Sequence, residues 1–177
     1  EFLSKGFEGA RTSVIAEKAG VTHAMFHYYF RTKEQLFNRI CEEKMGSIVN
    51  GVFAAFEAEG TTLIDRICNA VGTHFDLLSK EPQLAQFALN TFLSQPERMD
   101  FAKKLLVEQL EPRFVALQLE INAQAEAGMM VRVAVPDLIY EIIALNFFAF
   151  VSLPIQKNIL PSLGIDPKNL LQHRREQ

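Results

Sequence analysis

Two short helical patterns lie close together near the start of the chain, and they constrain its fold more than any other feature. Residues 12–19 and 23–29 each carry apolar side chains at helical spacing. Only Gly20, Val21 and Thr22 separate them. Glycine tolerates the positive φ of a tight turn, and threonine is a favoured N-cap residue. Two helices joined this closely must cross at an angle and share an apolar hinge.

The apolar side chains of the two patterns face each other across that hinge, which consists of Ile15, Ala16, Ala19, Val21, Phe26 and Phe30. This pattern is typical of a helix-turn-helix, in which a supporting helix holds a second helix against the major groove of DNA. The second helix leaves His23, His27, Tyr28 and Tyr29 for solvent. These side chains can reach phosphate oxygens or base edges.

Lys33 begins the next helical pattern, residues 33–57. The N–H groups and the dipole of a helix start attract phosphate, and a lysine there would add to that attraction. We therefore expect Lys33 to contact the DNA backbone.

Five stretches within residues 6–37 follow one family pattern in register and without a gap. They are Gly6-Phe7, Ile15-Ala16, Ala19-Gly20-Val21-Thr22, Tyr29-Phe30 and Thr32-Lys33-Glu34-x-Leu36-Phe37. In these stretches the chain resembles the DNA-binding domain of the tetracycline-repressor-like (TetR/AcrR) family. The resemblance implies a homodimer, double-stranded DNA with a palindromic operator, and a variable helical domain for dimerisation and for a small ligand.

Four residues depart from the family's usual pattern. His23 and Ala24 stand where the family usually has a lysine and a small residue, His27 stands where it usually has tyrosine, and Arg11 stands where serine or threonine is common. The residues expected to contact DNA are Arg11, Thr12, Thr22, His23, Ala24, His27, Tyr28, Tyr29 and Lys33. Of the two tyrosines, we expect one to pack and one to reach a phosphate.

The remainder of the chain is helical in pattern too, and no strand alternation or hairpin signal is present. Further helices are expected at residues 63–78, 83–93, 97–127, 136–153 and from 166 onward, with a kink or restart at Pro112. The predicted class is all-α: a three-helix helix-turn-helix domain at residues 1–45, then a larger helical ligand-binding and dimerisation domain at residues 46–177. Because Glu1 already lies in a helical pattern without an N-cap, we expect the first helix to begin upstream.

A phenylalanine-rich interior without tryptophan favours an adaptable apolar pocket in the larger domain. The candidate lining residues are His74, Phe75, Phe87, Asn90, Asn146 and Phe147. The histidine and the two asparagines would orient a ligand, although each such residue can equally be an ordinary core or surface residue. Residues 136–153 and 166–177 are the candidate dimer interface.

Charge and motifs narrow the functional classes. Residues 1–50 carry a net charge of +1 and the rest −4, a bias toward DNA at the front that is weak. Cys41 and Cys68 lack metal-ligand spacing and are interpreted as buried thiols of a reducing cytoplasm. We expect no metal, cofactor or catalysis, because the four histidines are scattered and no phosphate loop occurs. The late apolar stretch, residues 145–153, is too short for a membrane span.

These observations favour a homodimeric, cytoplasmic DNA-binding regulator, a repressor released by a small apolar ligand. The alternative is an all-helical carrier or enzyme for an apolar ligand that keeps a helix-turn-helix without using it. The weak positive charge and the altered recognition helix favour that alternative. Selection of bound DNA from a random pool distinguishes the two.

Overall fold

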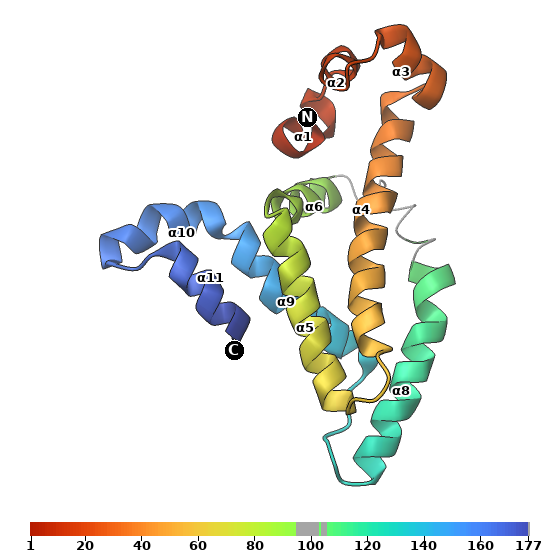
Figure 1. The fold of residues 1–177 in the computed structure, drawn as a ribbon, viewed down its shortest axis with the longest axis vertical. Coiled ribbons are helices and arrows are strands. Elements are labelled where there is room, and N and C mark those ends of the chain that lie inside the picture. The colour runs from red at the N-terminus through yellow and green to blue at the C-terminus, as the bar shows by residue number, and fades with distance from the viewer. Residues whose placement is uncertain (95–102, 104–105, 177) are drawn as a thin grey trace.

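The computed structural model describes residues 1–94, 103 and 106–176, and throughout that part of the chain the regular elements are helices. A small unit of α1 (Phe2–Gly9), α2 (Thr12–Lys18) and α3 (His23–Phe30) lies at one end, and α4 (Lys33–Phe56) runs from it along the molecule (Figure 1). α5 (Leu63–Lys80) packs along α4, and α6 (Gln83–Ser94) packs against α1.

The second half of the chain completes a helical bundle and adds an arm. A π-helical turn (Leu106–Leu110) leads into α8 (Glu111–Glu126), which lies beside the lower part of α4, and α9 (Val135–Val151) packs on α5 and α6 (Figure 1). α10 (Leu153–Ile159), a 3₁₀ turn (Leu160–Leu163) and α11 (Pro167–Glu176) form the arm. The all-α class is confirmed, and so is the restart at Pro112, which lies in the first turn of α8. Part of the helix expected at residues 97–127 lies outside the described residues.

Local sequence explains where the helices of this N-terminal unit begin and end. Gly6 interrupts α1 with φ 66°, a left-handed value that favours glycine. Thr22 caps α3 by accepting a hydrogen bond from the Met25 backbone N–H (3.2 Å), and Thr32 caps α4 in the same way. The turns that the sequence predicts are therefore present.

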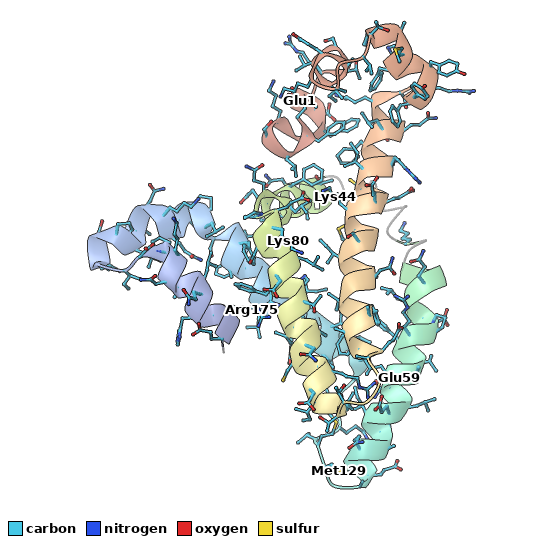
Figure 2. The ribbon with its side chains drawn as sticks, in the orientation of Figure 1. Glu1, Lys44, Glu59, Lys80, Met129 and Arg175 are labelled. Atoms are coloured by element: carbon cyan, nitrogen blue, oxygen red, sulfur yellow. The ribbon has the colours of Figure 1, made fainter. Side chains whose placement is uncertain are left out.

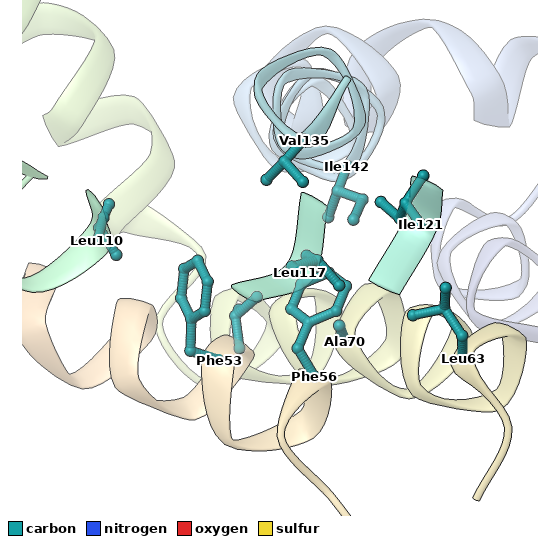
Figure 3. Packing of buried hydrophobic residues seen from close by; sticks show 10 residues of the cluster. Phe53, Phe56, Leu63, Ala70, Leu110, Leu117, Ile121, Val135 and Ile142 are labelled. Atoms are coloured by element: carbon teal, nitrogen blue, oxygen red, sulfur yellow. The ribbon is translucent and has the colours of Figure 1, made fainter. Parts of the chain in front are cut away.

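Among the described residues, α4 contributes buried side chains to two of the hydrophobic cores. The first core surrounds Phe37, a fully buried side chain whose ring centroid lies 5.1 Å from that of Phe2 and 5.6 Å from that of Phe87 on α6. It includes the expected hinge residues Ala16 and Phe26. The second core joins α4, α5, α8 and α9, and its members include Phe53, Phe56, Leu63, Ala70, Leu117, Ile121, Val135 and Ile142 (Figure 3). The domain boundary expected at residue 45 thus falls inside a helix that serves both cores.

The arm returns to the bundle through an ion pair. Arg175 of α11 donates to both carboxylate oxygens of Asp76 on α5, at 2.8 and 3.0 Å, and lies close to that helix in Figure 2. Gly72 makes room for this approach, because a Cβ at that position would lie 2.9 Å from the guanidinium. Of the two cysteines, Cys41 is buried as expected, whereas Cys68 is exposed because it faces away from the second core.

Within the described residues no single helix is long and apolar enough to cross a membrane. One bent pair, Val135–Val151 with Leu153–Leu163, passes that test only when its two parts, which meet at 49°, are taken together.

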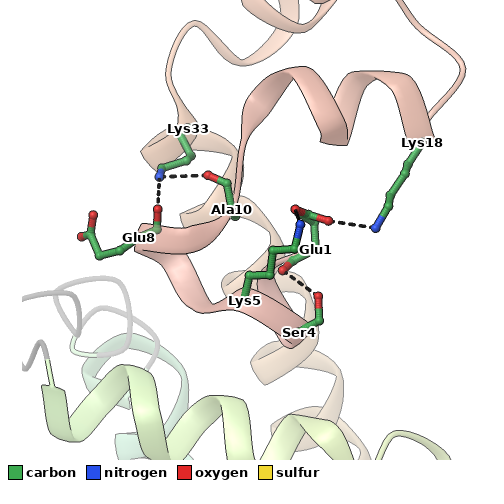
Figure 4. A network of polar contacts seen from close by, with 7 residues as sticks. All are labelled: Glu1, Ser4, Lys5, Glu8, Ala10, Lys18 and Lys33. Atoms are coloured by element: carbon green, nitrogen blue, oxygen red, sulfur yellow. Dashed lines mark hydrogen bonds and ion pairs between the residues drawn. The ribbon is translucent and has the colours of Figure 1, made fainter.

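Lys33 has a structural role. Its ammonium donates to the backbone carbonyls of Phe7 (2.8 Å), Ala10 (3.1 Å) and Glu8 (3.4 Å), which follow the break in α1. Figure 4 shows the contacts with Glu8 and Ala10. It also lies 4.5 Å from the centroid of the Phe7 ring. An ammonium has three donors, and here carbonyls engage all three. Lys33 therefore ties the first helix to the start of α4.

A buried polar contact joins α5 to α9. The Asn146 side-chain N–H₂ donates to the Val71 carbonyl (2.9 Å) and lies 3.3 Å from Nδ1 of His74. His74 is only 6% exposed, and this burial lowers its pKa from 6.5 to about 4, because the charged imidazolium is poorly solvated there. The imidazole is consequently neutral in the folded protein at neutral pH.

We predict that Lys33→Ala lowers the free energy of unfolding by about 1–3 kcal/mol, because three carbonyls lose a charged donor. Urea denaturation measures this change. Lys157→Ala removes an exposed lysine from α10 and should stay within about 0.5 kcal/mol of the parent chain. An unchanged midpoint for Lys33→Ala would contradict the structural role.

We predict that His74 makes the fold less stable in mild acid. The unfolded chain binds this proton near pH 6.5 and the folded chain only near pH 4, so stability falls as the pH is lowered across that window. Across the whole window the free energy of unfolding falls by about 3 kcal/mol. Urea denaturation from pH 7 downward should show that the free energy of unfolding falls less steeply with pH in His74→Gln than in the parent chain. His173→Gln should keep the pH dependence of the parent chain. Equal slopes in all three chains would refute the assignment.

Candidate nucleic-acid interface and cavity

The outer face of α3 presents an almost continuous polar and aromatic surface. Phe26 is buried in the first core and Phe30 packs against it, so the helix has only one covered side. The expected contact residues His23, Ala24, His27, Tyr28 and Tyr29 are all exposed. Tyr28 is 81% and Tyr29 67% exposed, so the expectation that one of them packs is wrong. Both phenols point away from a core that Phe26 and Phe30 already fill.

Hydrogen bonds fix the two histidine rings on this face. His23 Nε2 lies 2.9 Å from the Thr12 hydroxyl of α2, which links the supporting helix to the recognition helix. His27 Nδ1 lies 3.0 Å from the carbonyl oxygen of Arg31. A carbonyl only accepts, so Nδ1 carries the proton, and Nε2 of the neutral ring is left as an acceptor. The two ring centroids are 4.5 Å apart. The pair thus offers oriented groups of the kind that read base edges.

The other expected contact residues differ in how accessible their polar groups are. Arg11 is exposed at the start of α2. Thr12 is half-buried beside His23, and Thr22 uses its hydroxyl oxygen as the N-cap of α3. Lys33 has its ammonium engaged by three carbonyls, which leaves it without a donor for phosphate in this arrangement.

Sequence reasoning missed Met25, which is 43% exposed on the same helix as the histidines. It also missed Arg31, an exposed residue that ends α3 with φ 53°. A non-glycine residue rarely adopts this left-handed value, and no sequence signal for it is present.

A small network of charged side chains surrounds Glu1 at the start of the N-terminal unit. Glu1 pairs with Lys5 (2.7 Å) and with Lys18 of α2 (2.8 Å), as Figure 4 shows for Lys18. Hydrogen bonds from these two lysines hold the pKa of the Glu1 carboxyl down at about 2. Their positive charges are therefore partly neutralised within the unit and contribute less to an attraction for DNA.

A cavity of about 490 Å³ lies between the two cores. It is bordered by α1 through Phe2 and Leu3, by the middle of α4 from Ile40 to Phe53, and by α6 through Phe87. Side chains of α5 and α9 close the opposite side. The volume is within the range of pockets that hold small molecules. Because Phe87 also packs on Phe37, a molecule in the cavity would touch the first core directly.

The structure brings three of the six expected pocket residues together. His74, Phe87 and Phe147 line the cavity. Asn146 lies behind His74 as its hydrogen-bond partner, and Phe75 packs on Phe150 with 5.0 Å between ring centroids. Asn90 is exposed and accepts from Gln86, because it faces away from the bundle. The lining residues on α1 and α4 were missed, since their spacing predicts only ordinary core positions.

Comparison with known proteins gives this fold a family. The family model described as "Bacterial regulatory proteins, tetR family" matches residues 1–40. The uncharacterized HTH-type transcriptional regulator YdgC of Bacillus subtilis is 30% identical over 142 residues, which cover 73% of this chain and 71% of YdgC. The fatty acid metabolism regulator protein of the same species is 29% identical over 80 residues, which cover 45% of this chain and 41% of that protein.

Solved structures share the fold across the whole chain. The fatty acid degradation regulator FadR of Bacillus halodurans superimposes with a TM-score of 0.67 at 19% identity, covering 99% of this chain and 86% of FadR. The TetR family regulator PfmR of Thermus thermophilus gives a TM-score of 0.58 at 15% identity, covering 99% of this chain and 90% of PfmR. At these identities the likeness concerns the fold alone. Together with the YdgC alignment and the N-terminal match, it shows that this chain belongs to the tetR family of bacterial regulatory proteins and is a transcription regulator with a DNA-binding helix-turn-helix.

Proposed function

We propose that this chain is a homodimeric repressor that binds a palindromic operator through α3 and releases it when an apolar molecule fills the cavity. The observation that carries the proposal is the position of the cavity. It borders α1, α4 and α6 at the junction between the DNA-binding unit and the larger helical unit. The proposed division remains residues 1–45 and 46–177, with α4 shared by both.

The outer face of α3 supports major-groove binding. Two oriented imidazoles and two exposed phenols lie on a helix that is anchored from behind by Phe26. In helix-turn-helix dimers the two recognition helices enter successive major grooves, about 34 Å apart or a multiple of that distance. The spacing of the two copies of α3 would then decide whether the operator is bound.

The ligand class is supported by the cavity wall and by a relative's name. The described lining residues are almost all aliphatic or aromatic, and Lys44 and His74 are the exceptions with strongly polar groups. One similar protein is named as a regulator of fatty acid metabolism. We therefore propose an aliphatic chain as the ligand. It can release DNA only by binding more tightly to the arrangement of α1 and α6 that does not fit the operator.

The proposed dimer interface lies on α9 and α11. Along α9 an exposed band contains Tyr140 (73%), Leu145 (59%) and Phe148 (69%). Large apolar side chains this exposed in the middle of a helix are typical of a surface that a partner covers. α11 is held to the neighbouring α5 by Arg175.

Selection of bound duplexes from a random pool, followed by fluorescence anisotropy at several salt concentrations, tests the proposed DNA binding. We expect enrichment of a palindrome whose affinity falls steeply with salt, because bound cationic groups release counterions from DNA. Without such enrichment, the chain would fit the alternative of an apolar-ligand carrier that does not use its helix-turn-helix.

We predict that Arg11→Ala and His23→Ala weaken DNA binding in different ways. Arg11→Ala should weaken binding to all duplexes alike and lower the salt slope by about one, because it removes a phosphate contact. His23→Ala should change the preferred bases at one position in each half-site, by about 1–3 kcal/mol. Anisotropy on a set of single-base operator variants measures both effects.

The matched control for Arg11→Ala is Arg132→Ala, which removes an exposed arginine from the loop after α8. It should leave both affinity and salt slope unchanged. A uniform loss for His23→Ala across all operator variants would refute its assignment to base reading.

We predict that Phe148→Glu converts the dimer to a monomer, because it places a carboxylate in the apolar centre of the proposed interface. Sedimentation equilibrium should give the mass of two chains for the parent and of one chain for the variant. Val131→Glu replaces an apolar residue that is 81% exposed outside the band and should remain dimeric. A parent chain that sediments as a monomer at micromolar concentration would overturn the proposed interface.

A further inference from the structure

Among the described residues that line the cavity, two side chains can offer N–H donors to it. Lys44 lies at its edge on α4 (Figure 2), where its ammonium pairs with Glu81. The side chains of this pair are 41% and 39% exposed, so their charges face solvent as well. His74, by contrast, is buried on α5. The polar character of the inner wall therefore depends on which atoms of His74 carry a proton.

The contacts of Asn146 settle that question. The Val71 carbonyl can only accept, so the Asn146 atom 2.9 Å from it is the amide nitrogen. The same nitrogen lies 3.3 Å from His74 Nδ1, which must then accept. A neutral imidazole has one N–H, and with Nδ1 as the acceptor that proton is on Nε2.

Nε2 is the free side of the ring. Among the residues that the structure describes, none accepts a hydrogen bond from it, although His74 lines the cavity. A ligand oxygen in the cavity would supply the acceptor that this N–H lacks. Burial also keeps the ring neutral, since it lowers the pKa of His74 to about 4.

A neutral donor in an apolar wall distinguishes between ligand oxygens. A carbonyl oxygen accepts a hydrogen bond and brings no charge into the cavity. A carboxylate would bring a full negative charge, and a single neutral N–H compensates that charge poorly. The arrangement thus favours an uncharged acceptor on an otherwise aliphatic molecule.

We propose that His74 is the residue that determines ligand specificity, and that its Nε2–H selects an aliphatic acyl group with an uncharged carbonyl, such as an ester or thioester, over the free carboxylate. Asn146 acts as a positioning residue, because it holds the ring in the tautomer that donates. This inference rests on the proposed ligand-binding function of the cavity.

Calorimetric titration of the full chain with methyl decanoate and with decanoate, near pH 8, tests the proposal. We expect the ester to bind at least about tenfold more tightly than the carboxylate. His74→Phe should lower the affinity for the ester about tenfold, the value of one buried hydrogen bond. His74→Gln keeps an N–H donor near the Nε2 position and should retain most of the ester's affinity.

Two controls separate the hydrogen bond from other effects. Phe147→Leu changes the apolar wall alone and should weaken the ester and the carboxylate by similar factors. Thermal unfolding of each variant shows whether it is folded. If His74→Phe does not fold, the affinities of His74→Gln test the proposal instead. The ester's advantage should be the same near pH 6 and near pH 8, because His74 stays neutral in both conditions.

Three results would overturn the inference. Decanoate binding as tight as that of the ester, and abolished by Lys44→Met, would show that the lysine selects an anionic ligand. A full preference for the ester in His74→Phe would exclude the histidine as its source. The third such result would be that neither methyl decanoate nor decanoate binds.

The DNA selection described above keeps this inference separate from the proposed regulator. Salt-sensitive binding to a selected palindrome, without binding of either probe, would leave the DNA-binding part of the proposed function standing. Ester binding without any DNA binding would support this inference and contradict the regulator.

Discussion

One helix belongs to both hydrophobic cores, and the arrangement of the rest of the molecule depends on it. α4 contributes Leu36 and Phe37 to the core of the DNA-binding unit and Phe53 and Phe56 to the core of the larger bundle. Within the described residues the two cores form separate clusters. The stretch of α4 between them borders the cavity instead. Among the described residues, α4 and the contact of α6 with α1 link the lower bundle to the unit that contains α3, and a shift of the bundle can reach α3 through either.

The two routes differ in their structure. α4 is one continuous helix from Lys33 to Phe56, so a tilt at its lower end also moves its upper end. The contact of α6 with α1 is part of a group of packed rings, in which Phe87 of α6 packs on Phe37 of α4 and Phe37 packs on Phe2 of α1, next to the cavity. Close-packed interfaces of this kind tend to switch between discrete arrangements. A ligand beside Phe87 can therefore stabilise one of these arrangements relative to the other.

The helix-turn-helix could be predicted from the sequence because its determinants are local. Gly20, Thr22 and Thr32 fix turns through their own backbone and side-chain chemistry, and Phe26 follows helical spacing. The role of Lys33 could not be predicted, since its acceptors lie 23 to 26 residues earlier. The cavity was predicted only in part for the same reason: His74, Phe87 and Phe147 were candidates, whereas Phe2 and Ile40 line it through contacts between distant segments. Both tyrosines are exposed because neighbouring phenylalanines already fill the core, which helical spacing alone does not reveal.

The central claim is that cavity and operator are coupled through α4 and α6. The most direct test compares two affinity ratios with the same full-length chain: DNA with and without saturating methyl decanoate, and methyl decanoate with and without the selected duplex. Thermodynamic linkage requires the two ratios to be equal. We expect both to show weakening by a common factor of about 5–150, the usual range of coupling between sites. A common ratio of one, with both molecules bound at once, would contradict the account.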